Sequence, residues 1–267
     1  MKRTNIILTI IVIIFAIILA FLTSLTYKDF KKTNSSNSFY NSVLDFTQKN
    51  SKKVFSIDKI TYFSSSNANI STNSNSVFTI SDLYQYTDIA IFINRAEKDY
   101  TNENTLESVE LNDINFSLKP AVGNPNLYYK SLSDFATPKF QADNLITDEL
   151  TFNTTSEDEI DYSTPTLYNN CANPITLCYV NSNIKDKHTL FNDVSNISYN
   201  GSLLKTCNIT LNSISCKIDF VIKIVNNLDE TFVCPLSLNI PLSTESSTIY
   251  DGSLTLKDNT SYEFIKI

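Results

Sequence analysis

Hydrophobic residues follow two different patterns along this chain of 267 residues. Near the N-terminus they form one run, IILTIIVIIFAIILAFLTSL, from Ile6 to Leu25, in which Thr9 is the only polar residue before Thr23. From residue 54 onward they occur in short segments that are rich in β-branched and aromatic residues and bounded by Asn, Ser, Asp or Pro. The first pattern predicts a long apolar helix, and the second predicts a succession of β-strands.

The N-terminal run is long enough to cross a membrane. A helix of this length rises about 30 Å, which matches the hydrocarbon core of a bilayer. A cleaved secretory signal has a shorter apolar region followed by a small-x-small site, and no such triplet follows here. A lipoprotein signal is excluded because the first cysteine is Cys171. We therefore expect residues 1–27 to form a cytoplasmic tip and an uncleaved anchor that contacts the lipid bilayer through Ile6 to Leu25.

The charges beside the anchor do not settle its orientation. Lys2 and Arg3 precede the run, and three lysines (28, 31 and 32) follow it, so the positive-inside count is nearly balanced. The five cysteines favour an exported C-terminal body, on the outer side of the cell membrane. A cytosolic body with reduced thiols is the alternative.

The rest of the chain predicts an all-β protein. Residues 28–53 suit a juxtamembrane spacer with a short amphipathic helix near 39–44. Strand-like segments recur at 54–63, 87–94, 113–118, 148–153, 175–180 and 247–256 without a long helical period between them. This pattern favours one antiparallel β-sandwich over residues 54–267, of the jelly-roll or immunoglobulin-like kind, with two smaller β domains as the alternative. We expect the Ser- and Asn-rich stretch 64–76 to form a mobile loop.

The clearest predicted structure is a hairpin near the C-terminus. Apolar residues alternate with polar ones from Ile214 to Ile224, and again from Phe232 to Ile240. The intervening NNLDE predicts a turn, so the two strands would bury one shared face. Pro235 places the second strand at a sheet edge or at a bulge.

The cysteine spacing indicates structural thiols. Zinc knuckles and thioredoxin-like pairs need C-x-x-C, whereas the closest spacings here are C-x6-C and C-x8-C. If a strand carrying Cys207 turns near residue 211, Cys207 opposes Cys216, which predicts a cross-strand disulfide. Cys171 could bridge Cys178 locally, or either could bridge Cys234, and one thiol of the five is left over in a monomer.

Composition excludes several classes of function. A formal net charge of -7 and a pI of about 4.8 argue against nucleic acid as a partner. The single histidine, His188, excludes a His-pair metal site, and we expect it in a surface loop. Three isolated glycines cannot build a phosphate-binding loop. We therefore expect no cofactor and no enzymatic activity.

One acidic stretch, SEDEIDY at 156–162, needs a separate explanation. Its carboxylates suit Ca²⁺, but it lacks the spacing and glycine of an EF-hand loop, so a solvated loop is the favoured interpretation. A pair of carboxylates could also hydrolyse a glycosidic bond. A carboxylate-dependent extracytoplasmic hydrolase, with or without Ca²⁺, is therefore the alternative function.

With the anchor, TDIAIFIN, TLYNNCANPITLCYVN and IYDGSLTLK in view, the chain resembles uncharacterised single-pass surface proteins of AT-rich, Gram-positive-type bacteria. The resemblance implies a location at the cell membrane and a β-rich body, and it supplies no catalytic residues. We expect a binding or structural role at the cell surface, with a protein partner or self-association through sheet edges.

Overall fold

The computed structural model describes residues 54–72, 78–95, 104–156, 160, 162–170, 174–190, 202–241, 252–257 and 262–267. Lys53–Ile267 form one compact unit. The expected anchor, the juxtamembrane helix, Cys171 and four acidic residues of the 156–162 stretch lie outside the described residues. None of the helices that the structure does describe is long and apolar enough to cross a membrane.

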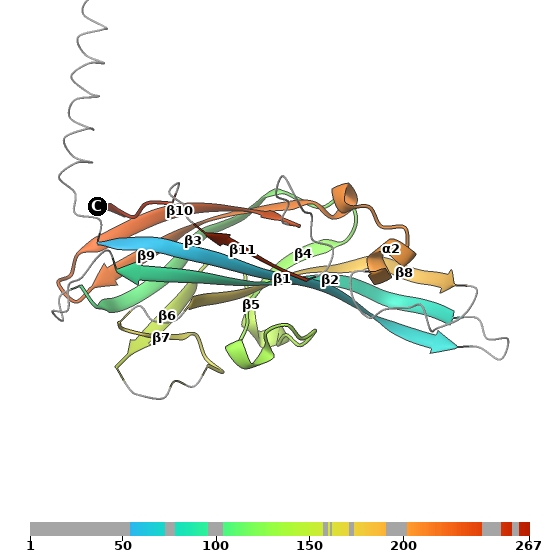
Figure 1. Cartoon of the computed structure of the whole chain (residues 1–267), viewed down its shortest axis with the longest axis horizontal. Coiled ribbons are helices and arrows are strands. Elements are labelled where there is room, and N and C mark those ends of the chain that lie inside the picture. The colour runs from blue at the N-terminus through green and yellow to red at the C-terminus, as the bar shows by residue number, and fades with distance from the viewer. Residues whose placement is uncertain are drawn as a thin grey trace, which may run out of the picture. The chain divides into compact units, whose positions relative to one another are not determined.

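The described chain is all-β, as the sequence predicts, and its strands form two sheets (Figure 1). Sheet A has the order β11 (Gly252–Lys257), β1 (Phe55–Thr72), β2 (Phe78–Arg95), β8 (Pro174–Leu190), β4 (Asn124–Tyr129), β5 (Leu145–Ile146). Sheet B has the order β12 (Ile265–Lys266), β10 (Thr231–Ile240), β9 (Cys216–Asn226), β3 (Leu106–Leu118), β6 (Leu150–Thr155), β7 (Thr166–Tyr168). Every described pairing is antiparallel except that of β6 with β7.

Alternating side chains hold the two sheets together. Along β9, every second residue from Cys216 to Asn226 is buried, because successive side chains of a strand point to opposite faces. The main core contains residues of both sheets, such as Ile91 and Leu177 of sheet A and Ile222 and Leu236 of sheet B. This shared core makes the fold a β-sandwich.

The predicted C-terminal hairpin is confirmed. β9 and β10 pair antiparallel, with Phe220 opposite Leu236 and Ile222 opposite Cys234. Pro235 lies on β10, and among the described strands the short β12 alone pairs with the outer side of β10, at residues 232 and 233. Proline is tolerated there because the outer main-chain positions of that strand need no ladder partner.

The prediction of a loop over 64–76 is wrong for residues 64–72. These residues continue β1 and pair with β2 as far as Thr72 opposite Phe78. The small hydroxyl side chains fit a close-packed interior: Ser64 is buried, and its Oγ lies 2.8 Å from Oγ1 of Thr87. Cross-strand pairing and burial therefore override the low strand propensity of Ser and Asn.

The strand predicted around Cys207 is also wrong. This segment forms a short helix, α2 (Ser202–Thr206), followed by the 3₁₀ turn η4 (Leu211–Ile214). Leu203, Leu204 and Cys207 recur at helical spacing and are all buried, and the Cys207 N–H donates to the Leu203 carbonyl at 3.0 Å. Thr210 caps η4 by accepting the Ser213 N–H. Cys207 therefore does not oppose Cys216 in a ladder.

A second apolar cluster lies where the C-terminal part of β1 and the N-terminal part of β2 run beside β8. The helix α2 packs there (Figure 1). It contains Ile80, Leu83, Ile184, Leu203, Leu204, Cys207 and Ile214. The backbone of His188 lies in β8 opposite Ile80, so the prediction of a loop at this histidine is wrong.

Candidate functional site

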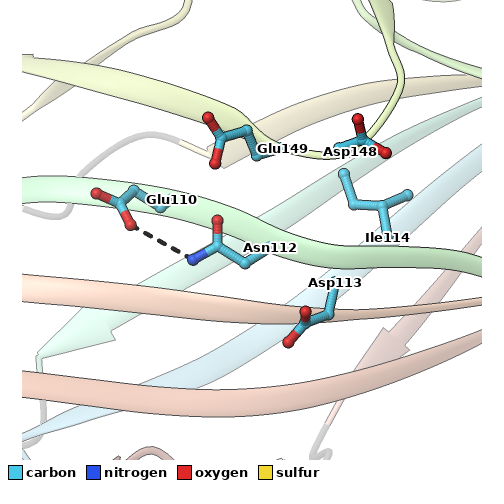
Figure 2. A pocket seen from close by; sticks show the side chains of 6 residues that line it. All are labelled: Glu110, Asn112, Asp113, Ile114, Asp148 and Glu149. Carbon is cyan, nitrogen blue, oxygen red and sulfur yellow. Dashed lines mark hydrogen bonds between the residues drawn. The ribbon is translucent and has the colours of Figure 1, made fainter.

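The first candidate site is an acidic recess of about 520 Å³ at sheet B (Figure 2). It is lined by Glu110, Asn112, Asp113 and Ile114 of β3 and by Asp148 and Glu149, which precede β6. Asp148 and Glu149 are exposed, because the turn before β6 lies at the surface. The recess therefore offers four carboxylates to a ligand from solvent.

The carboxylates of the recess do not converge on one point. Figure 2 shows the carboxyl groups of Glu110, Asp113 and Glu149 standing apart from one another, with none of them pointing at another. Lys223 of β9 donates a hydrogen bond from Nζ to Oε2 of Glu110 at 3.0 Å. This hydrogen bond lowers the pKa of the Glu110 carboxyl group. Glu110 is thus unsuited to act as a general acid. Among the described residues, no cluster of His, Cys, Asp or Glu is arranged to hold a metal ion.

The second candidate site is a buried ion pair on the other face of sheet A. Ile89 and Ile91 of β2 point into the main core, so Asp88 between Thr87 and Ile89 points to the opposite face. Lys130 follows the last residue of β4, and its Nζ lies 2.7 and 2.9 Å from the two carboxyl oxygens of Asp88. The side chains of Lys130 and Asp88 are 1% and 0% exposed.

Aromatic side chains and a loop shield this pair from water. Tyr86, Cys178 and Val180 form a buried cluster, against which Phe63, Tyr84, Tyr128 and Phe140 pack. The Lys130 ammonium also lies 5.1 Å from the Tyr86 ring centre and donates to the Thr137 carbonyl at 2.7 Å. The pair is therefore held between the sheet and the segment that follows β4.

The backbone of this covering segment is strained where it meets Asp88. Ala136 has φ 58°, a left-handed conformation that costs a residue with a Cβ on the order of 1 kcal/mol. Its N–H donates to Oδ2 of Asp88 at 2.8 Å. This hydrogen bond accounts for the unusual conformation.

Burial sets the protonation behaviour of this site. Desolvation raises the pKa of Asp88, against the opposing effect of Lys130. Desolvation also raises the pKa of the neighbouring Cys178 thiol, and the Asp88 charge raises it further. Cys178 is therefore a protonated thiol with none of the features of a reactive nucleophile.

The structure separates Cys207 from Cys216 and Cys178 from Cys234, whereas the predicted pairings of Cys171 lie outside the described residues. Cys178, Cys207, Cys216 and Cys234 are all buried, and no two of these described cysteines form a disulfide with each other. Cys178 packs beside Asp88 and Cys207 packs under α2, whereas Cys216 and Cys234 belong to the main core. Their burial agrees with the general preference of free cysteine for the interior.

The sequence interpretation missed Asp88 and Lys130. A signal was present, because Asp88 is the only charged residue in the strand-like TDIAIFIN, and a charge inside such a segment requires a partner when buried. The partner lies 42 positions along the chain, and no local pattern connects the two residues.

The site thus belongs to an all-β, two-sheet sandwich with one buried ion pair and one open acidic recess among its described residues. No protein-family model, no curated protein and no solved structure matches this chain.

Proposed function

We propose that this chain is a membrane-anchored extracytoplasmic protein whose β-sandwich has a binding or structural role at the cell surface. The run from Ile6 to Leu25 would anchor it in the bilayer, and the body would extend outside the cytoplasm. The outer edge of β1 from residue 65 to Thr72 carries this proposal, since none of the strands that the structure describes pairs with it. β11 pairs with β1 only over residues 59–64.

An open strand edge is suited to binding because its main-chain N–H and C=O groups can pair with a strand of another chain. Asn69, Ser71 and Thr72 on this segment are exposed. The edge of β10 is better protected, by Pro235, by β12, and by the Tyr262 hydroxyl that donates to the Ser237 carbonyl at 3.1 Å. The partner would therefore add a strand to β1.

The test introduces lysines, which block strand addition. A full chain carrying Asn69→Lys and Ser71→Lys is purified from membranes after chemical crosslinking and compared with the unaltered chain. We expect the crosslinked partner, or the crosslinked second copy, to disappear. The control is Leu228→Lys in the exposed β9–β10 turn, which leaves the β1 edge intact. A crosslinked product that persists at the same yield in the double lysine variant would contradict the proposal.

A carboxylate-dependent hydrolase is the second candidate, and the acidic recess is the observation that favours it. Asp148 and Glu149, which precede β6, are two of its exposed carboxylates, beside Asp113 of β3. Hydrolysis of a glycan or peptide by the full chain, lost in Asp148→Asn with Glu149→Gln, would replace the binding role with an enzymatic one.

A further inference from the structure

The buried pair of Asp88 and Lys130 plays no part in the proposed binding role. Asp88 belongs to β2 and Lys130 follows β4, and both strands pair with β8, which lies between them. Cys178 of β8 is opposite Asp88 on one side and Tyr128 on the other. A link between Asp88 and Lys130 would therefore tie two strands together across a third.

We propose that Lys130 and Asp88 condense into an intramolecular isopeptide bond, an amide that joins Nζ of Lys130 to Cγ of Asp88. The site is then a self-modification site of the sandwich rather than an ordinary ion pair. It needs no second substrate, since both reacting groups belong to this chain.

The distances place the reacting atoms close together. Nζ of Lys130 lies 2.7 and 2.9 Å from the two oxygens of one carboxyl group, which puts it about 3 Å from Cγ, the separation of a near-attack pair. Both side chains are almost completely excluded from water. When two groups are held this close and water is excluded, the amine and the carboxyl group react as if each were present at a very high concentration.

The atoms of the reaction balance without an added reagent. The Lys130 ammonium transfers one proton to Oδ1 of Asp88, which gives a neutral amine and a neutral carboxylic acid. The amine attacks Cγ, and the Cγ–Oδ1 bond breaks as a second proton passes from nitrogen to Oδ1. One water molecule leaves, and one amide bond remains. Because burial raises the pKa of Asp88, the first proton transfer costs less free energy in this site than it would cost in water.

The hydrogen-bonding groups around Asp88 and Lys130 suit the amide product as well as they suit the ion pair. The Ala136 N–H donates to Oδ2 at 2.8 Å, where negative charge develops during attack and where the amide oxygen remains afterwards. The Thr137 carbonyl, which accepts from Nζ at 2.7 Å, lies where the amide N–H needs an acceptor. The product keeps both hydrogen bonds and removes two buried charges, whose desolvation is costly.

The test is the mass of the purified full chain under denaturing conditions, followed by tandem mass spectrometry of its tryptic peptides. We expect the chain to be lighter than its sequence by one water molecule. We also expect a branched peptide in which residue 88 and residue 130 are joined. The peptide measurement is decisive because succinimide formation at Asp251-Gly252 would remove the same mass.

Two variants separate the bond from the ion pair. Lys130→Arg keeps a positive charge beside Asp88 but lacks a nucleophilic amine, so the water loss and the branched peptide should both disappear. Lys223→Met removes the exposed pair with Glu110 and should keep both. Unmodified peptides containing Asp88 and Lys130 in the native chain would overturn the proposal and leave an ion pair only. A water loss that maps to Asp251 would overturn it equally.

Discussion

At the residue scale, burial decides what each polar group of this protein does. Lys266 and Glu230 form an ion pair at 2.5 Å with side chains 55% and 30% exposed, so it contributes little to stability. Lys130 and Asp88 are buried, and removing either one would leave an uncompensated charge in the interior. The same rule governs the thiols. Burial raises the pKa of Cys216 and of Cys234 to about 11, so both are protonated at neutral pH.

The buried thiols should be unreactive until the protein unfolds. In a Cys171→Ser full chain, we expect a maleimide at neutral pH to add no label to the folded protein, because its four remaining cysteines are buried. In denaturant without a reducing agent, intact mass should show four adducts. Adducts that appear in denaturant only after reduction would mean that two of these cysteines form a disulfide.

At the element scale, a row of buried polar residues lies between the main core and the second apolar cluster, the one against which α2 packs. Ser66, Gln85 and Asn181 are opposite one another on β1, β2 and β8, and all three are buried. Both side-chain amide atoms of Gln85 lack a hydrogen-bond partner among the residues that the structure describes, as do Ser66 Oγ and Asn181 Oδ1. The Asn181 Nδ2, by contrast, donates to the Val122 carbonyl at 2.9 Å.

Replacing Gln85 should therefore stabilise the fold. Gln85→Met keeps the length of the side chain and removes a buried amide, so we expect the free energy of unfolding to rise by about 1 kcal/mol or more. Urea unfolding followed by tyrosine fluorescence measures it, since the chain has no tryptophan. Thr87→Val is the matched control, because it breaks the 2.8 Å contact with Ser64 and should destabilise. A loss of stability in Gln85→Met would show that the amide is satisfied in solution.

The ion pair of Glu110 in β3 with Lys223 in β9 should stabilise the fold to an extent that depends on pH. Lys223 lowers the pKa of Glu110, so the folded state binds that proton less readily than the unfolded state. The stabilisation is present above the unfolded pKa and is lost as the pH falls through the folded pKa. Both side chains are about one third exposed, so the effect is on the order of 0.5 kcal/mol. The stability difference between the native chain and Lys223→Met should therefore shrink between neutral pH and about pH 3. A difference that stays constant over this range would contradict the assignment.

These elements show which parts of the fold were predictable. The alternation from Ile214 to Ile224 predicts most of β9 (Cys216–Asn226) and its buried face, because alternate side chains of the strand enter the core. Residues 64–66 are all serine and show no alternation of apolar and polar side chains. Their pairing with β2 is what makes them part of a strand. The helix before Cys207 has only five residues, so the helical spacing of Leu203, Leu204 and Cys207 covers a single turn and does not distinguish a helix from a strand in the sequence. The pair of Asp88 and Lys130 depends on contacts far apart in the sequence, and the jelly-roll or immunoglobulin-like subtype stays a prediction.

At the scale of the whole molecule, the proposed anchor leaves two orientations to distinguish, because the positive charges on the two sides of Ile6 to Leu25 are nearly balanced. The native cysteines are poor reporters of this topology, since the four that are described are buried. Leu228, in the turn between β9 and β10, is 53% exposed and leaves the core untouched. A cysteine placed there would report the environment of the folded body directly.

We expect a Cys171→Ser, Leu228→Cys full chain to react with a membrane-impermeant maleimide on intact cells. The Cys171→Ser chain without the reporter should stay unlabelled, because its remaining described thiols are shielded by the fold rather than by the membrane. A permeant maleimide should label the reporter in intact and lysed cells alike, which shows that the turn is accessible in both. Labelling by the impermeant reagent only after lysis would place the body in the cytoplasm. In that case the β1 edge would have to meet its partner inside the cell, whereas the proposed bond between Lys130 and Asp88 would be unaffected, since it depends only on groups within the fold.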